Sequence, residues 1–291
     1  MTAPVPRPPF ARARLVGSGF GARLLAHALA ARAAAETEWI PERADEAIPG
    51  VTTLSRTEAL VEESERTPVD LLVLATQKSS AVESLVWIAP HLSALVVVIS
   101  DSLVEAHGIG NVATGLAPEC LATAARPMLA PRLAAEESPD QGFVGRPVAI
   151  ASAPRTPEAA LASAERFWIL LGAIPVVVDP EALDRRSAAT EWLAPWSAAA
   201  LARLGAAEVA RGSSEELLTG PAFLEATEIL ARDLEVSVPT AVRRAKRIAP
   251  ALRSLSGDLA RAADLLESGD VSAVEDWLQP AFSFRRRFPD L

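Results

Sequence analysis

Residues 13–35 read ARLVGSGFGARLLAHALAARAAA and contain the motif on which the fold assignment depends. An apolar, strand-like run ends at Gly17, a turn follows, and a stretch rich in Ala and Leu continues from Ala22. A strand, a G-x-G-x-x-A turn and a helix in this order form the dinucleotide-binding fingerprint. In it Gly17 permits the tight turn, Gly19 lets the backbone approach a pyrophosphate, and Ala22 allows close packing of helix on strand.

This loop predicts a nucleotide site at the N-terminus of the following helix, where free N–H groups and the helix dipole attract phosphate. We expect its cofactor-binding residues to be Gly17, Ser18, Gly19, Phe20 and Ala22. The alternative is a domain of the same fold that keeps its glycines for the turn alone.

Strand-like and helical segments alternate through the first 180 residues, as in a parallel sheet covered by helices. We expect strands over 13–16, 37–40, 70–75, 95–100, 148–152 and 174–178, and helices over 22–35, 81–89 and 159–171. The later part of the chain has helical spacing only, and helices are expected over 185–204, 221–233, 238–267 and 271–286.

The predicted architecture is an α/β Rossmann-type dinucleotide-binding domain over residues 1–180 and an all-α domain for dimerisation and substrate binding over residues 181–291. We expect Pro250 to break or kink its helix, and Asp270 after Gly269 to be a helix N-cap. The helical domain carries more apolar residues than a domain of this length can bury, which predicts a homodimer.

Charge and residue content argue against several functions. The net charge of −9 and the isoelectric point near 5.0 disfavour nucleic acid, because phosphates require clustered positive charge. One Cys excludes an intramolecular disulfide and a Cys-based zinc site, and no metal site is expected. Neither a secretory signal nor an apolar stretch of about 20 residues is visible, so we expect a cytoplasmic protein that does not bind membranes.

Candidates for acid–base chemistry are few, because the chain has three His, no Tyr and only two Lys. The absence of Tyr excludes the Tyr–Lys pair of short-chain reductases. His107 follows the predicted strand 95–100 and is the His best placed for an active site.

Further candidates lie where predicted strands end, at the edge where open α/β sheets bind ligands. Ala75 and Thr76 are expected to contact the cofactor, and Ser102 the nicotinamide or the substrate. After the second strand, Glu42 would bind the ribose hydroxyls of NAD, whereas Arg43 would bind the 2′-phosphate of NADP. NAD and NADP both remain open, and each of these residues could instead be a turn, cap or solvated loop residue.

The chain resembles the prephenate and arogenate dehydrogenases. The resemblance rests on the glycine fingerprint, on DLLVLA at 70–75, on segments 92–102, 145–152 and 171–173, and on the tail 250–277. It implies a Rossmann domain with a helical dimerisation domain, a cofactor that is NAD or NADP, and oxidative decarboxylation of a cyclohexadienyl substrate on the route to tyrosine.

The sequence departs from this family at its active-site histidines. Arg126, in Ala125–Met128, stands where the family has the His of a Gly-x-His-Pro-Met segment, and Trp192, in Glu191–Pro195, stands in the family's Ser-His-x-Pro-His-like segment. Asp184 of the family's His-Asp pair is retained. Arg126 cannot act as a base, but it can bind a carboxylate or stabilise an oxyanion. We therefore expect Ser102, Arg126 and Asp184 to be catalytic, and Arg126 and Trp192 to bind substrate.

These observations favour an NAD(P)-dependent oxidoreductase that transfers hydride on prephenate, arogenate or a related small carboxylate in a remodelled pocket. One alternative is a non-catalytic dimeric homologue that binds a nucleotide or a partner. The other is an imine or ketone reductase.

Overall fold

The computed structural model describes residues 10–41, 47–61, 69–76, 78–88, 92–100, 102–116, 120–129, 139–152, 156–209, 220–231 and 238–287. The chain forms two compact units, Met1–Asp184 and Arg185–Leu291. Arg43 and Glu42, the two candidates for cofactor selection, lie outside the described residues, as does His91.

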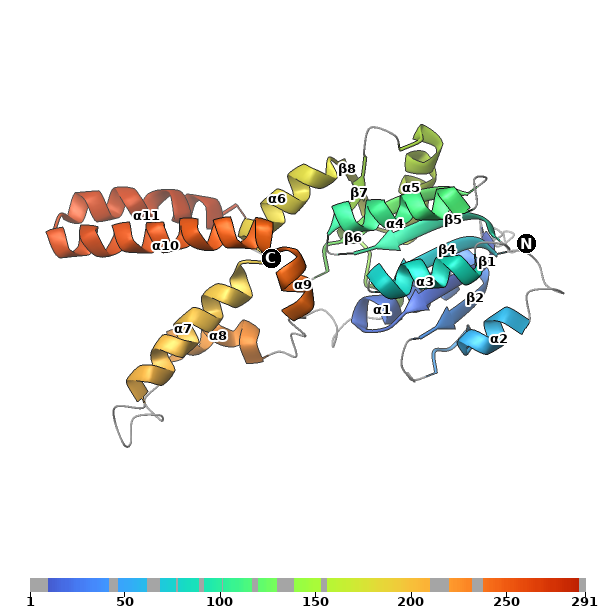
Figure 1. Ribbon diagram of the computed structural model, residues 1–291, viewed down its shortest axis with the longest axis horizontal. Helices are drawn as coiled ribbons and strands as arrows, with labels where there is room; N and C mark the ends of the chain where they lie inside the picture. Colours follow the sequence, from blue (N-terminus) through green and yellow to red (C-terminus); the bar gives the residue numbers. More distant parts are fainter. Residues whose placement is uncertain are drawn as a thin grey trace, which may run out of the picture. The chain divides into compact units, whose positions relative to one another are not determined.

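The described part of the first unit contains an eight-stranded sheet in the order β3-β2-β1-β4-β5-β6-β7-β8 (Figure 1). All neighbouring strands are parallel except β6 and β7. The chain runs from β1 to β2 and β3 on one side, then crosses to β4 on the other, so the carboxyl ends of β1 and β4 meet at a topological switch point. The strands are β1 Phe10–Gly17, β2 Ala34–Ile40, β3 Val51–Thr53, β4 Val69–Ala75, β5 Leu92–Ile99, β6 Leu121–Pro127, β7 Pro147–Ala151 and β8 Ile174–Val178.

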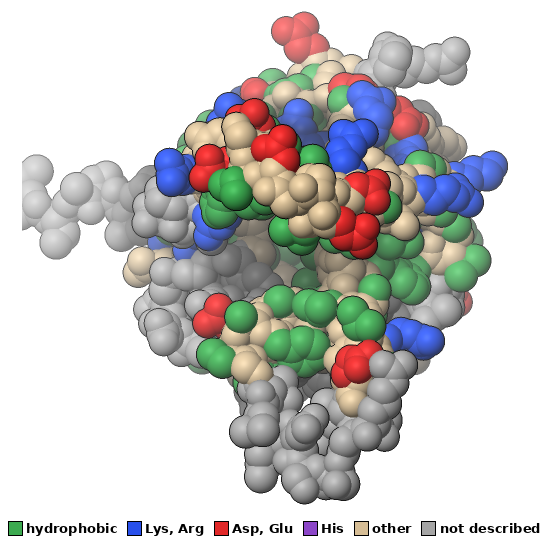
Figure 2. Space-filling view, turned by 90° about the vertical axis from the view of Figure 1, so that its left-hand side faces the viewer, with side chains coloured by type: hydrophobic (Ala, Val, Ile, Leu, Met, Phe, Trp, Pro, Cys, Tyr) green, Lys and Arg blue, Asp and Glu red, His purple; other side chains and the backbone are tan. Residues whose placement is uncertain are grey.

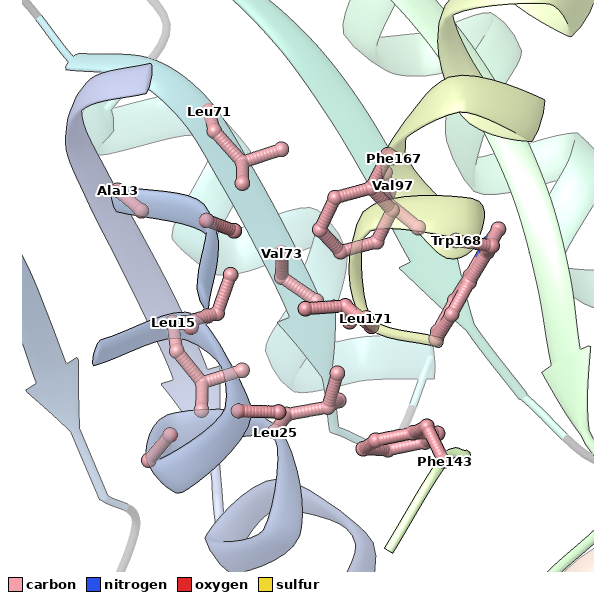
Figure 3. Packing of buried hydrophobic residues seen from close by; sticks show 14 of the residues in the cluster. Ala13, Leu15, Leu25, Leu71, Val73, Val97, Phe143, Phe167, Trp168 and Leu171 are labelled. Atoms are coloured by element: carbon pink, nitrogen blue, oxygen red, sulfur yellow. The ribbon is translucent and has the colours of Figure 1, made fainter. Parts of the chain in front are cut away.

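Helices cover both faces of this sheet. Two of them, α1 (Phe20–Ala28) and α5 (Glu158–Leu170), pack on one face, while α3 (Lys78–Ile88) and α4 (Leu103–Leu116) pack on the other together with Ala59 of the short α2 (Arg56–Val61). Figure 3 shows the first layer, where side chains of three neighbouring strands meet those of α1 and α5: Leu15, Val73, Val97, Leu25 and Phe167. The α/β Rossmann-type architecture expected from the sequence is confirmed.

Two elements beside the candidate site were not predicted, namely β6 and α4. Strand β6 reads LATAARP and has one β-branched residue, so it lacks the usual strand signal. It is a strand because β5 pairs with it on one side and β7 on the other, which buries Thr123 to Arg126. The predicted helix over 22–35 was also too long, since α1 continues into one π-helical turn, Leu29–Ala33, and β2 already begins at Ala34.

The later part of the chain is helical in its described residues, as predicted. Its elements are α6 Pro180–Thr190, α7 Ala194–Val209, α8 Pro221–Ala231, α9 Val238–Arg243, α10 Ala245–Ser268 and α11 Val271–Arg285. The long helix expected over 185–204 is divided between α6 and α7. Helices α10 and α11 lie side by side (Figure 1). Among the described helices, none combines the length and apolar character that crossing a bilayer requires.

The two local predictions in this region had different outcomes. Asp270 is the N-cap of α11, and its carboxylate accepts a hydrogen bond from the Ala273 N–H at 3.1 Å, which confirms the expected cap. Of the break or kink expected at Pro250, the break was wrong, because α10 is continuous there and the helical segment divides at Arg244 instead, while the kink stays a prediction. Ile248 and Leu252, on either side of Pro250, pack in one hydrophobic cluster, which compensates for the hydrogen bond that proline cannot donate.

Candidate functional site

The glycine turn joins the carboxyl end of β1 to the N-terminus of α1. A Cβ at Gly17, where φ is +138°, would lie 2.1 Å from the Ala75 carbonyl oxygen, so no side chain fits between β1 and β4. At Gly19 it is the backbone conformation, and not a lack of space, that requires glycine. Its φ of +93° and ψ of 179° suit only glycine, but a Cβ there would meet nothing within 4 Å. Gly17 thus serves strand packing, while Gly19 leaves open space in front of the helix.

The N-terminus of α1 has the properties of an anion site. Gly19 is the N-cap and has no side chain to accept hydrogen bonds from the first N–H groups, and the first turn contains no acidic residue. Ala22 is buried against the sheet, which lets the helix axis approach it closely. These N–H groups and the positive end of the helix dipole therefore face the space in front of Gly19, where a pyrophosphate would fit.

The end of β4 adds a polar atom beside the turn. Ala75 pairs with Gly17 across β1 and β4, and Thr76 follows it directly. The Thr76 hydroxyl oxygen is buried and has no hydrogen-bond partner among the described residues. A buried hydroxyl with no partner is costly. Its position beside the glycine turn therefore fits a ligand that supplies the missing hydrogen bond.

The end of β2 is apolar and carries a buried tryptophan. In register with β1, Leu15 is opposite Trp39 and Val16 is opposite Ile40, so Ile40 and Pro41 stand nearest the glycine turn. The indole N–H of Trp39 donates a 2.8 Å hydrogen bond to the Gly17 carbonyl oxygen. The sequence analysis did not identify this contact, because only the strand register brings the two residues together.

Glu38 of β2 is engaged away from the turn in a buried ion cluster. Its Oε1 accepts hydrogen bonds from Arg12, at 2.8 Å to Nε and 2.6 Å to a terminal guanidinium nitrogen. Its Oε2 accepts from Arg14 Nε at 2.8 Å. All three side chains are at most 3% exposed, so this carboxylate is held inside the unit by the two arginines. The alternation of Arg12 and Arg14 along one strand face was a signal that the sequence analysis overlooked.

Ser102 and Asp184 come together from distant parts of the chain at the start of α4. The Ser102 hydroxyl donates to Asp184 Oδ2 at 2.6 Å, and Asp184 also accepts from the backbone N–H groups of Leu103 at 2.9 Å and Val104 at 3.3 Å. Ser102 Oγ in turn accepts from the Glu105 N–H at 3.3 Å. Asp184 is 0% exposed. Both residues therefore cap α4, which begins beside the carboxyl end of β5.

Arg126 lies at the same edge of the sheet, near the carboxyl end of β6. The Ser100 N–H donates to the Ala125 carbonyl at 3.2 Å, which joins the end of β5 to β6 next to this arginine. The Arg126 side chain is 5% exposed. A guanidinium keeps its charge when buried, so it can bind a carboxylate in two hydrogen bonds or stabilise a developing oxyanion.

Trp192 lies in the second unit, between α6 and α7. Its ring is covered by the Arg244 guanidinium, whose central carbon is 4.6 Å from the ring centroid, a cation–π distance. It packs with Ala188 and Ile248 in a buried cluster of that unit. These contacts account for its burial within the second unit, and a role in substrate binding stays a prediction.

Both described histidines have a pKa below the ordinary value. Burial lowers the pKa of His107 on α4. Burial also lowers the pKa of His27 on α1, and the nearby Arg23 charge lowers it further, while Asp140 acts in the opposite direction. Among the described residues, His107 makes no side-chain hydrogen bond or ion pair with Ser102, Arg126 or the glycine turn.

Comparison with known proteins identifies the fold. No protein-family model matches the chain, and no curated protein sequence matches it. Solved structures do match. Arogenate dehydrogenase from Synechocystis shares 17% of residues, with a TM-score of 0.73 over 95% of this chain and 99% of that one. Prephenate dehydrogenase from Aquifex aeolicus, in complex with hydroxyphenyl propionate and NAD+, shares 15%, with a TM-score of 0.72 over 95% of this chain and 98% of that one.

A second Aquifex aeolicus prephenate dehydrogenase structure gives a TM-score of 0.73 at 15% identity, over 94% of this chain and 99% of that one. At such low identity the likeness establishes a shared fold. The chain therefore has the fold of the prephenate and arogenate dehydrogenases along nearly its whole length, and the resemblance seen in the sequence is confirmed at the level of the fold.

Proposed function

We propose that this protein is an NAD(P)-dependent oxidoreductase. The observation that carries the proposal is the glycine turn, where Gly19 adopts a glycine-only conformation and opens space before the uncapped N-terminus of α1. The shared fold supports it, since one of the matching structures contains NAD+.

In this proposal the cofactor lies across the switch point between β1 and β4. Gly17, Ser18, Gly19, Phe20 and Ala22 form the pyrophosphate cradle, with backbone N–H groups as donors. Ala75 and Thr76 contact the cofactor where β4 ends, and the Thr76 hydroxyl gains the partner that it lacks among the described residues. When bound, the nicotinamide would accept or supply a hydride. NAD and NADP are both candidates, since Glu42 would favour NAD and Arg43 would favour NADP.

The proposed substrate is a small carboxylate, of which prephenate and arogenate are the first candidates, with oxidative decarboxylation as the first reaction to test. Arg126 would bind the carboxylate or stabilise charge on a substrate oxygen. Ser102 and Asp184 would act by holding the start of α4 beside the reacting edge, since Asp184 is buried and accepts three hydrogen bonds.

We further propose that the second unit mediates a homodimer. Figure 2 shows hydrophobic side chains exposed among charged ones on one face of the molecule. Large apolar side chains on the helices of the second unit are 54% to 69% exposed, including Leu204, Leu224, Leu259, Leu266, Val271 and Phe282. Exposed apolar area of this kind is typical of protein interfaces.

The deciding experiment is titration of the purified protein with NADH and NADPH, followed by nucleotide fluorescence. Saturable binding of either nucleotide supports the proposal, whereas no binding at millimolar nucleotide contradicts it. Prephenate and arogenate are then tested as hydride donors with each oxidised cofactor. Arg126→Ala should lower kcat/KM by at least tenfold without changing the affinity for the nucleotide, because a charged hydrogen-bond pair is worth about 1.5–3 kcal/mol. Unchanged kinetics would remove Arg126 from the mechanism.

A further inference from the structure

Trp39 makes a buried hydrogen bond to the glycine turn. It lies near the end of β2, opposite Leu15 of β1, and is 0% exposed. Its indole N–H reaches across the strand pair to the Gly17 carbonyl oxygen at 2.8 Å. The contact is not a general consequence of burying an indole, since the equally buried Trp168 has no hydrogen-bond partner for Nε1 among the described residues.

This hydrogen bond restrains the orientation of the peptide that follows Gly17. The Gly17 carbonyl and the Ser18 N–H belong to one planar trans peptide and point in opposite directions. Because Trp39 holds the carbonyl toward the core, the Ser18 N–H is directed away from the core. Gly17 has a φ of +138° and lacks a side chain, so its own backbone preferences restrict this peptide little.

We propose that Trp39 is a positioning residue for dinucleotide binding, which fixes the Gly17–Ser18 peptide so that the Ser18 N–H faces the pyrophosphate. The inference rests on the proposed function and names a residue outside the fingerprint motif. In this arrangement the indole does not touch the nucleotide. It lowers the cost of binding, because the peptide need not be reoriented when the anion arrives.

The test compares Trp39→Phe with Trp168→Phe. Both variants replace a fully buried tryptophan of the same hydrophobic cluster by a smaller aromatic ring, but only the first removes the bond to Gly17. We expect similar losses of thermal stability. The Kd for NADH or NADPH should rise about tenfold in Trp39→Phe and less than twofold in Trp168→Phe, in line with the usual net worth of a hydrogen bond.

Amide hydrogen exchange over residues 18–22 of the nucleotide-free protein gives a second measurement. Exchange should be faster in Trp39→Phe than in Trp168→Phe, and equal exchange with equal Kd values would overturn the inference. If the unaltered protein binds neither nucleotide, the proposed function fails, and with it the part of the inference that concerns binding. The exchange comparison would still decide whether Trp39 fixes the peptide, so the two failures are distinguishable.

Discussion

The hydroxyl of Ser102 and the carboxylate of Asp184 are joined by a 2.6 Å hydrogen bond across 82 positions of sequence. The same carboxylate accepts two backbone N–H groups at the start of α4. One buried acid thus ties the chain after β8 to the helix that follows β5, beside the carboxyl end of that strand.

Asp184→Ala is expected to lower the free energy of unfolding by about 2–4 kcal/mol, because it leaves buried N–H donors without an acceptor. Chemical denaturation measures this. Asp184→Asn, which keeps one acceptor oxygen, should lose less. An alanine variant as stable as the parent would show that the cap contributes nothing.

Glu38→Gln is expected to destabilise the protein by about 3–5 kcal/mol, because the neutral amide no longer compensates the two buried guanidiniums of Arg12 and Arg14. The matched control is Glu36→Gln, an exposed acid on the same strand, which should change the unfolding free energy by less than about 0.5 kcal/mol. Equal effects of the two substitutions would contradict the importance of the cluster.

Alanine substitutions at the two glycines of the turn are expected to differ in their effects on fold stability and on nucleotide affinity. Gly17→Ala should destabilise the fold by about 3 kcal/mol or more, because its Cβ would overlap the Ala75 carbonyl. Gly19→Ala meets no atom within 4 Å, and should cost only the backbone strain of about 1–3 kcal/mol.

Gly19→Ala, the variant with the smaller expected loss of stability, should nevertheless bind nucleotide at least about tenfold more weakly. The reason is that the new methyl group occupies the proposed phosphate position. Thermal denaturation and nucleotide titration on the same samples give both quantities. A Gly19→Ala protein that binds nucleotide normally would place the pyrophosphate elsewhere.

The lowered pKa of His107 predicts how stability depends on pH. Its folded-state pKa is below the ordinary value of 6.5, so the unfolded chain binds the proton more readily. The contribution of His107 is therefore fully present above pH 6.5 and is lost as pH falls through the folded-state pKa. Unfolding free energies measured from about pH 7.5 to 5.5 should decline less steeply in His107→Gln than in the parent. Identical slopes would show that the histidine is not desolvated.

Sequence patterns were sufficient where the local signal and the tertiary environment agree. The glycine fingerprint predicted the β1–α1 turn, and Asp270 after Gly269 predicted the start of α11. They were insufficient for β6, whose Ala-rich sequence is a strand only through its two neighbours. Of the break or kink expected at Pro250 they also misjudged the break, because packing of Ile248 and Leu252 keeps that helix continuous.

The sequence by itself determined the architecture and the place of the glycine turn, because hydrophobic periodicity and glycine spacing are properties of short segments. Its resemblance to the prephenate and arogenate dehydrogenases also led to the expectation, still untested, that Arg126 and Trp192 stand where that family has histidines. Only the tertiary structure decided which buried side chains contact one another. Trp39 meets Gly17, Glu38 meets two arginines, and Asp184 meets Ser102 through strand register and chain crossing, which bring together residues that no local pattern relates.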